Sequence, residues 1–194
     1  MKRPIKVFYF DVETTGFDPV KNDITQISGM IEIDGKIVEK FDLRAKPLDW
    51  DSVSEDALEV TGIGLEELKK NPPAGVTHRE LIEILDKYCN KFDRDDKYYF
   101  AGYNVRFDID FLYQFFQKQG DNYFGSWFNW CALDPLSIIH YLSYKGILKF
   151  SSHKLEAICE SFDIKIKAHD AMNDIEATRK VFKKLEKILK EGKR

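Results

Sequence analysis

The pattern of apolar and polar residues alternates between strand-like and helix-like segments along most of the chain. Residues 5–10 form a nearly continuous apolar run, which is typical of a central strand buried on both faces. Two further strand-like segments, 24–33 and 36–44, flank Asp34-Gly35, a dipeptide that favours a tight hairpin turn. The sequence therefore predicts three initial strands, of which the second and third are antiparallel.

The rest of the chain predicts helices that alternate with shorter strands. A capping box at Thr77 and Glu80 predicts a helix start, and apolar residues as far as Phe92 recur behind it at helical spacing. The further expected elements are strands over 98–102 and 127–133, short helical pieces at 55–60 and 65–69, and helices over 106–119, 135–142, 152–162 and 170–190. This order of elements predicts an α/β domain of three layers, with helices on both sides of a mixed sheet.

Composition fits one globular domain with a sizeable core. The chain has 194 residues, of which 43% are hydrophobic and 32% are charged. We therefore expect a single domain over 1–194, with its core from about residue 5 to about residue 189. The formal net charge of −3 argues against a protein that coats nucleic acid through bulk positive charge. This net charge is compatible with an enzyme that binds a few phosphate groups through metal ions.

The N-terminus and the cysteines bear on the cellular compartment. The basic residues of 1–6 are not followed by a long apolar run, because Asp11 interrupts it, and no segment approaches the length of a membrane span. Cys89, Cys131 and Cys159 are widely spaced among apolar neighbours, which predicts buried free thiols in a reducing compartment. The expectation is a cytoplasmic protein without membrane association.

Two carboxylates, Asp11 and Glu13, follow the first apolar segment and stand one residue apart. Residues i and i+2 of an extended chain point to the same face, so both carboxylates project toward one point. Such a pair repels itself and is costly to desolvate, and a divalent cation such as Mg²⁺ relieves both problems. The alternative is a strand that simply ends in an acidic turn.

Two further acidic sites occur later in the chain. Asp108 is expected in the first turn of a helix that follows a buried strand, where ligands bind in open α/β sheets and where a carboxylate also suits the helix dipole. Asp174 is expected about one turn into the last helix, after His169, a side chain that accepts a proton near neutral pH. Next to a metal-binding Asp, His169 becomes a candidate general base, whereas Asp110 is interpreted as solvent-facing.

These three segments together resemble the three motifs of the DEDDh exonucleases, the histidine-bearing DEDD branch also called DnaQ-like. The matching segments are Phe10-Asp-Val-Glu-Thr-Thr-Gly16, Asn104-Val-Arg-Phe-Asp108 and His169-Asp-Ala-Met-Asn-Asp174. The resemblance runs from about residue 5 to about residue 185. The family includes the epsilon (proofreading) subunit of bacterial DNA polymerase III, RNase T and oligoribonuclease.

The resemblance implies a ribonuclease H-like fold and a role for each motif residue. Asp11, Glu13, Asp108 and Asp174 would hold two divalent metal ions, Mg²⁺ or Mn²⁺, and His169 would take a proton from the attacking water. Thr14, Thr15 and Gly16 would contact the terminal nucleotide, and Asn104 and Phe107 complete the expected substrate-binding set. The structural alternatives are a plain polar turn at 14–16 and a core position for Phe107.

Several residues outside the motifs carry open alternatives. Tyr103 stands where many family members have His, and Asp134 is expected to cap a helix. The aromatic residues between Tyr123 and Trp130 suit either core and rim packing or a partner surface. A run of lysines, 180, 183, 184, 187 and 190, is expected on the exposed face of the last helix.

The sequence thus predicts a metal-dependent 3′–5′ exonuclease acting on single-stranded or frayed DNA ends in proofreading, repair or DNA processing. An exoribonuclease of the RNase T or oligoribonuclease type is the alternative, because sugar choice depends on contacts to the 2′ position. A non-catalytic nucleic-acid-binding module and a different metallophosphoesterase are less favoured, since all five catalytic-type residues are present. A DNA polymerase is a candidate partner, and the sequence makes no prediction of the oligomeric state.

Overall fold

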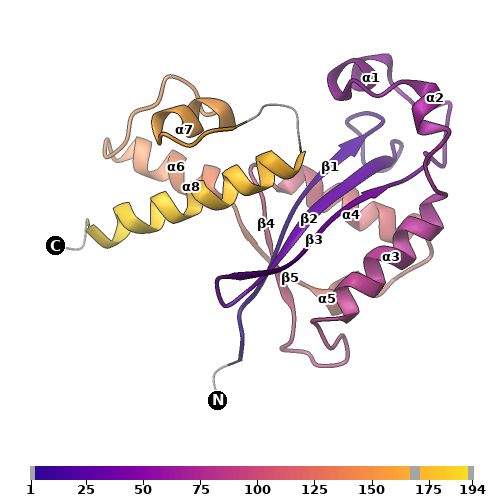
Figure 1. Ribbon diagram of the computed structural model, residues 1–194, viewed down its shortest axis with the longest axis horizontal. Helices are drawn as coiled ribbons and strands as arrows, with labels where there is room; N and C mark the ends of the chain where they lie inside the picture. Colours follow the sequence, from indigo (N-terminus) through magenta and orange to yellow (C-terminus); the bar gives the residue numbers. More distant parts are fainter. Residues whose placement is uncertain (1–2, 167–170, 192–194) are drawn as a thin grey trace.

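The computed structural model of the chain describes residues 3–166 and 171–191. A five-stranded sheet of these residues has the strand order β3-β2-β1-β4-β5 (Figure 1). The strands are β1 (Lys6–Thr14), β2 (Ile24–Ile33), β3 (Lys36–Arg44), β4 (Tyr98–Ala101) and β5 (Phe128–Leu133). The pairs β1–β2 and β2–β3 are antiparallel, whereas β4 runs parallel to β1 and to β5. The predicted mixed sheet is confirmed.

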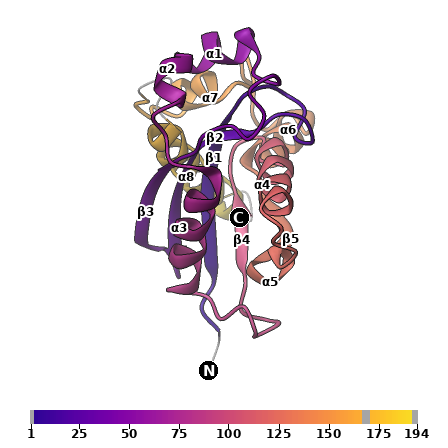
Figure 2. The same ribbon diagram turned by 90° about the vertical axis from the view of Figure 1, so that its right-hand side faces the viewer.

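Helices cover both faces of this sheet (Figures 1 and 2). The helices of the described residues are α1 (Glu55–Thr61), α2 (Leu65–Leu68), α3 (Ala74–Asp86), α4 (Arg106–Lys118), α5 (Phe124–Trp127), α6 (Pro135–Tyr144), α7 (Leu155–Ser161) and α8 (Ala171–Glu191). The helices α3 and α4 lie on one face, and α8 lies on the other together with α6 and α7. The three-layer arrangement is therefore as predicted.

The central strand β1 shows how the sequence produces these layers. Its residues alternate between the two faces of the sheet, and the stretch 7–10 is apolar on both faces. Phe8 and Phe10 pack into the core under α3 and α4, whereas Val7 and Tyr9 pack on the opposite side with Ile175 of α8. A strand segment that is apolar on both faces is buried between two helical layers.

Two local predictions about α3 are wrong. The helix begins at Ala74, directly after Pro73, so Thr77 lies inside it and does not start a capping box. Pro73 needs no N–H partner at the helix start, and the Thr77 hydroxyl instead donates to the Arg44 carbonyl oxygen at 2.6 Å. The helix ends at Asp86, and Phe92, expected on its inner face, is 88% exposed.

The edge of the sheet at β5 corrects one cysteine prediction. Cys89 and Cys159 are buried free thiols as expected, and burial raises the pKa of each to about 11. Cys131 is exposed, because it lies on β5, which has no strand beyond it in the described sheet. Among the aromatic residues of this region, Phe124, Trp127 and Phe128 are buried in the core, whereas Tyr123 and Trp130 are exposed.

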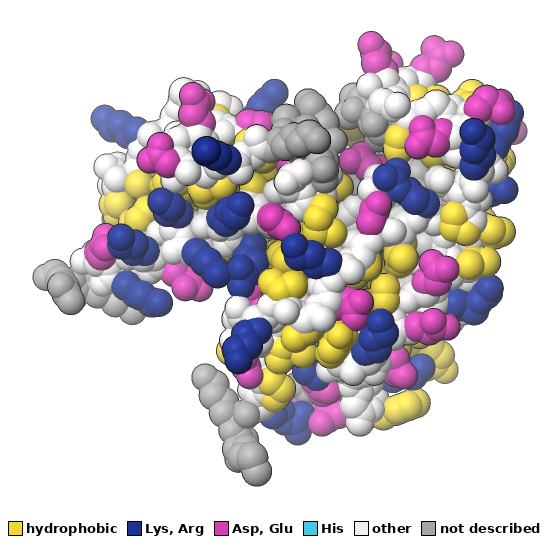
Figure 3. Space-filling model, in the orientation of Figure 1, with side chains coloured by type: hydrophobic (Ala, Val, Ile, Leu, Met, Phe, Trp, Pro, Cys, Tyr) yellow, Lys and Arg dark blue, Asp and Glu magenta, His cyan; other side chains and the backbone are white. Residues whose placement is uncertain are grey.

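The last helix carries the expected basic face. Lys and Arg side chains gather along α8 on the face shown in Figure 3, and the lysines of the predicted run are exposed. Lys187 and Lys190 lie 3.8 Å from Glu191 and Glu186, respectively. Within the described residues, no helix is long and apolar enough to cross a membrane.

Candidate active site

The first two carboxylates lie within β1, at the centre of the sheet. The strand continues to Thr14, so Asp11 and Glu13 belong to its hydrogen-bonded part and not to an acidic turn after it. Between them, Val12 points the other way and is buried. The predicted shared face of Asp11 and Glu13 follows from this regular strand geometry.

The helix α4 brings Asp108 to the same place. Asp108 stands in the first turn of α4, only 5% exposed, and its Oδ1 accepts a hydrogen bond from the Val12 backbone N–H at 3.1 Å. The turn from β4 into α4 passes very close to β1. A Cβ at Gly102 would lie 2.6 Å from the Val105 side chain and 3.1 Å from the Phe10 carbonyl oxygen. Glycine is therefore required for Asp108 to reach β1.

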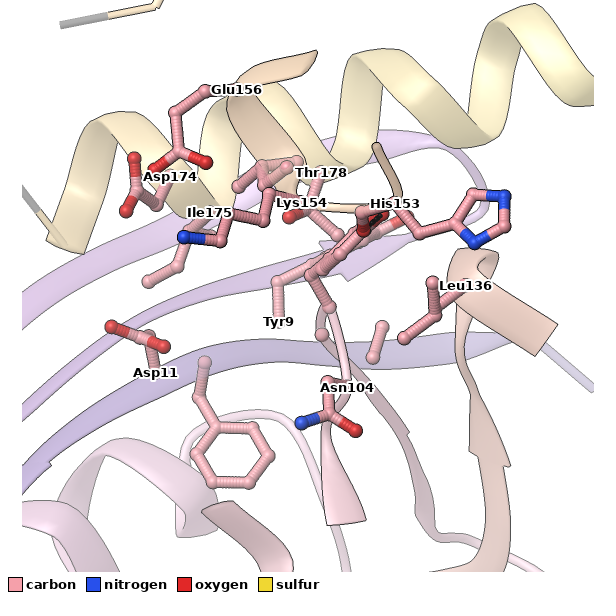
Figure 4. A pocket seen from close by; sticks show the side chains of 15 residues that line it. Tyr9, Asp11, Asn104, Leu136, His153, Lys154, Glu156, Asp174, Ile175 and Thr178 are labelled. Atoms are coloured by element: carbon pink, nitrogen blue, oxygen red, sulfur yellow. Dashed lines mark hydrogen bonds between the residues drawn. The ribbon is translucent and has the colours of Figure 1, made fainter. Parts of the chain in front are cut away.

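The third carboxylate comes from the opposite layer. Asp174 lies in the first turn of α8, and the next residue, Ile175, packs on Tyr9 and Val7 of the sheet. A cavity of about 450 Å³ separates the layers here, and Asp11 and Asp174 face each other across it (Figure 4). Three segments that are far apart in the sequence thus meet around one cavity.

The carboxylates raise one another's proton affinity. Burial raises the pKa of Asp11 well above its usual range, and repulsion from Asp108, Glu13 and Asp174 raises it further. Burial also raises the pKa of Asp108, assisted by Glu13, while the hydrogen bond from Val12 opposes the shift. Among the described residues, no Lys or Arg forms an ion pair with Asp11 or Asp108. The negative charge of Asp11 and Asp108 is therefore not balanced by an ion pair with any described Lys or Arg.

This donor set suits hard divalent cations. Carboxylate oxygens are the ligands that Mg²⁺ and Mn²⁺ prefer, and accumulated negative charge is what such ions compensate. Within the described part of the chain, no group of three or more His, Cys, Asp or Glu side chains could hold a metal ion. Mg²⁺ commonly uses only one or two carboxylates and completes its shell with water and substrate phosphate. The residues present fit that mode of binding.

The predicted substrate-binding residues are distributed unevenly around this cavity. Asn104 lines it, with a left-handed backbone (φ 56°) that its short polar side chain tolerates. The Thr14 hydroxyl donates to the Gly16 carbonyl oxygen at 2.7 Å, and the Thr15 hydroxyl accepts from the Asp23 N–H at 2.9 Å. Both hydroxyls hold the turn after β1, so their contact with a nucleotide stays a prediction.

Other predicted site residues are not among those that line the cavity: Glu13, Thr14, Thr15, Gly16, Phe107 and Asp108. Phe107 packs against the core and contacts Phe111, with ring centroids 4.7 Å apart, which favours the core alternative. His169 lies outside the described residues. Asp110, interpreted as solvent-facing, is partly exposed and paired with Arg106 at 2.8 Å.

The cavity also contains a cation to which the sequence analysis gave no role. Lys154, just before α7, lines the cavity, and its amine extends into it on the side of Asp11 and Asp174 (Figure 4). The Tyr103 hydroxyl donates to the His153 carbonyl oxygen at 2.5 Å and so fastens the segment that carries Lys154. A lysine at a helix N-terminus opposes the helix dipole. That mismatch was the signal that could have identified Lys154.

Comparison with known proteins places this site in context. A family model named RNase T and described as exonuclease matches residues 8–182. The chain is 31% identical over 170 residues to the PolC-type DNA polymerase III of Halalkalibacterium halodurans, and 27% identical over 175 residues to that of Bacillus subtilis. In each case the match covers 87% of this chain but 10% of the relative. The chain thus spans about a tenth of the length of these curated relatives.

Solved structures of exonuclease I have the same fold. A product-bound structure of exonuclease I superposes with a TM-score of 0.77 at 20% identity, covering 96% of this chain and 44% of that one. E. coli exonuclease I in complex with a dT13 oligonucleotide gives a TM-score of 0.73 at 20% identity, over 93% of this chain and 40% of that one. The predicted ribonuclease H-like fold, a mixed sheet between helices, is confirmed by this match.

Proposed function

The chain belongs to the RNase T exonuclease family, and from this premise we propose that it removes nucleotides from the 3′ end of single-stranded DNA. The resemblance to DnaQ-like exonucleases is thereby confirmed, and the chain is a nuclease. The observation that carries the proposal is that Asp11 and Asp174 face each other across one cavity while Asp108 is held against β1 close to Asp11. Family membership alone does not require that a particular chain keeps these carboxylates together.

The choice of DNA is supported by the relatives. Those named above are DNA polymerases III, and the exonuclease I structures include complexes with single-stranded dT13 and dA16 oligonucleotides. These facts describe the related proteins, of which this chain covers only a part. We extend them to this chain as a proposal for DNA ends, including frayed duplex ends, with a DNA polymerase as a candidate partner. A single exonuclease domain over 1–194, working in the cytoplasm, belongs to the same proposal.

We propose that Asp11, Glu13, Asp108 and Asp174 hold two divalent metal ions, Mg²⁺ or Mn²⁺. The accumulated negative charge of these residues supports this assignment. Such ions, when bound, activate the attacking water and stabilise the charge that develops on the phosphate and the leaving oxygen.

The remaining roles fall to other residues of this chain. His169, outside the described residues, is proposed as the general base that accepts the proton of the attacking water. Lys154 is placed to contact a phosphate oxygen of a bound strand, because its amine lies within the cavity and has no ion-pair partner among the described residues. Asn104 is positioned on the cavity wall to orient the terminal nucleotide.

A gel assay on 5′-labelled DNA and RNA of identical sequence tests the proposal. Each substrate is incubated with Mg²⁺, with Mn²⁺ and with chelator, and Asp11→Asn serves as the inactive control. We expect a ladder that shortens from the 3′ end only with metal, and faster for DNA. Preferential cleavage of RNA would replace the proposed substrate by the exoribonuclease alternative. Absence of cleavage for both nucleic acids would contradict the proposed activity.

A further inference from the structure

A second, smaller hollow lies on the outer face of α4. It is a groove of about 290 Å³ that is lined by Pro19, by one side of α4 and by Trp130 of β5. The α4 residues that line it are Arg106, Ile109, Asp110, Tyr113 and Gln114, which recur at helical spacing. We call these residues together the α4 groove.

The exposed aromatic rings of the α4 groove are its most unusual feature. Trp130 is 74% exposed and Tyr113 is 37% exposed, whereas the neighbouring Phe124 and Trp127 are 2% and 1% exposed. Among the ring contacts of the described residues, Trp130 has one, with Phe124, at a centroid distance of 6.5 Å. The Trp130 indole therefore makes little contact with the core, and the exposed face of the ring is accessible to a ligand.

The α4 groove and the acidic cavity are lined by neighbouring residues of the same two segments. The segment that leads into α4 contributes Asn104 to the cavity and Arg106 to the groove. The segment that includes β5 contributes Trp130 to the groove and, a few residues later, Leu136 to the cavity. A hydrogen bond of 3.2 Å from the Asn104 N–H to Asp134 Oδ1 joins the two segments. The groove therefore lies beside the part of the cavity wall that Asn104 forms, where the nucleotides next to a bound 3′ end would pass.

The charges of the groove favour bases over phosphates as the contacting groups. Arg106, the cation of the groove, is held by Asp110 through contacts of 2.9 and 2.8 Å, so its charge is locally balanced. Its guanidinium remains exposed, with 77% of the side chain accessible, and offers a flat face for stacking. Aromatic and guanidinium planes without surplus positive charge match the faces of nucleobases.

We propose that the α4 groove is a base-stacking subsite for nucleotides upstream of the 3′ terminus, with Trp130 as its main platform. The inference rests on the proposed exonuclease function, because it assigns the groove and the cavity to one strand. Stacking on aromatic rings tolerates any base, which suits an enzyme that degrades a strand of mixed sequence.

Tryptophan fluorescence gives a readout that does not depend on cleavage. The chain has three tryptophans, of which Trp127 is buried, Trp50 is 38% exposed and Trp130 is 74% exposed. The protein is titrated with phosphorothioate dT2 and dT8, which resist hydrolysis. We expect dT8 to quench the fluorescence strongly and dT2 to leave it nearly unchanged, because only the longer strand reaches Trp130.

Two substitutions at Trp130 separate stacking from folding. Trp130→Phe keeps a ring, so we expect dT8 to bind within about twofold of the wild-type affinity while the quenching disappears. Trp130→Ala removes the platform and is expected to weaken dT8 binding roughly tenfold. Hydrolysis of unmodified dT2 should be unaffected in both variants. Tyr144→Ala, which removes an 85% exposed ring from α6, is the matched control and should bind both strands normally.

The outcomes distinguish this inference from the proposed function. Wild-type affinity of Trp130→Ala for dT8, or quenching that persists in Trp130→Phe, would overturn the stacking subsite while leaving the nuclease intact. Failure of the wild-type protein to hydrolyse unmodified dT2 and dT8 with Mg²⁺ would instead count against the proposed function. Equal quenching by dT2 and dT8 would place the contact at the terminal nucleotide and also overturn the upstream assignment.

Discussion

Two buried aspartates, Asp23 and Asp108, are alike in burial and opposite in environment. Asp23 is 6% exposed and Asp108 is 5% exposed. Asp23 accepts hydrogen bonds from the N–H groups of Leu48 and Asp49 at 2.7 and 2.8 Å, and Lys118 Nζ lies 2.8 Å away. Asp108 accepts one bond from another residue, the Val12 N–H, and repulsion from Glu13 raises its pKa further above the value imposed by burial.

The difference teaches what burial alone does not reveal. A buried carboxylate is costly unless hydrogen bonds and an opposite charge compensate it. At Asp23 the protein provides both, so this residue serves the fold by holding the loop after β3 against α4. At Asp108 the described side chains provide no cation, and neighbouring carboxylates add to the cost. A fold that keeps such a group has a reason outside its own stability, which here is the binding of cations and substrate.

The largest expected effect is on activity. Asp108→Asn should lower the rate of 3′ hydrolysis by at least about 10³-fold, or ~4 kcal/mol, because it removes a proposed metal ligand. The free energy of unfolding of the Asp108→Asn variant should not fall, because the substitution removes a carboxylate that neighbouring carboxylates repel. Asp23→Asn is the matched control and should stay within a few-fold of wild type below its own melting temperature. The measurement is the initial rate of hydrolysis of 5′-labelled single-stranded DNA. Nearly equal losses of rate in both variants would contradict the assignment of a functional role to Asp108 and a structural role to Asp23.

The opposite pattern is expected for stability when the partner of Asp23 is removed. Lys118→Met leaves Asp23 buried beside an uncharged chain, which should lower the free energy of unfolding by about 3 kcal/mol. Urea denaturation in the presence of chelator measures this value. A loss below about 0.5 kcal/mol would show that the backbone N–H groups of Leu48 and Asp49 suffice, and that Lys118 is not needed to balance Asp23.

Added Mg²⁺ should stabilise the folded protein by binding near Asp108 and not near Asp23. At a Mg²⁺ concentration of ~100 times the dissociation constant, linkage predicts a gain of about 2.7 kcal/mol. The corresponding rise in melting temperature, measured with Mg²⁺ against chelator, should persist in Asp23→Asn and largely vanish in Asp108→Asn. An equal rise in both variants would assign the cation to a different place on the molecule.

The same contrast explains which parts of the site could be predicted from sequence. The positions of Asp11, Glu13 and Asp108 were predictable because strand alternation and helix starts are local, and each carboxylate lies in or next to an element that the sequence predicts. The position of Asp174 across the cavity depends on how α8 packs on the sheet, and the motif resemblance identified it before the structure showed that packing.

Other features were missed because their causes are not local. Thr77 looked like a helix cap, but Pro73 starts the helix earlier and the hydroxyl finds a carbonyl on β3. Cys131 looked buried among apolar neighbours, but strand order places it on the edge of the sheet. Lys154 could be singled out in the sequence only by its mismatch with the dipole of α7, and the cavity that its amine enters forms only when distant segments pack together.

The smallest expected effect concerns Lys154, whose role can be compared with that of Lys118. Lys118 contacts its carboxylate directly, whereas Lys154 lines an acidic cavity without an ion-pair partner among the described residues. If Lys154 contacts a substrate phosphate, Lys154→Met should raise KM about five- to tenfold, or ~1 kcal/mol, with kcat within twofold of wild type. Stability should not change, in contrast to Lys118→Met.

Steady-state kinetics on a short oligonucleotide, with Lys154→Arg as the charge-retaining control, measure this effect. Because Arg keeps the positive charge at similar reach, it should recover most of the lost affinity. A fall in kcat at constant KM would instead mean that Lys154 acts in the transition state. A loss of stability without a kinetic change would give Lys154 the structural role that Lys118 has, and the contrast between the two lysines would then disappear.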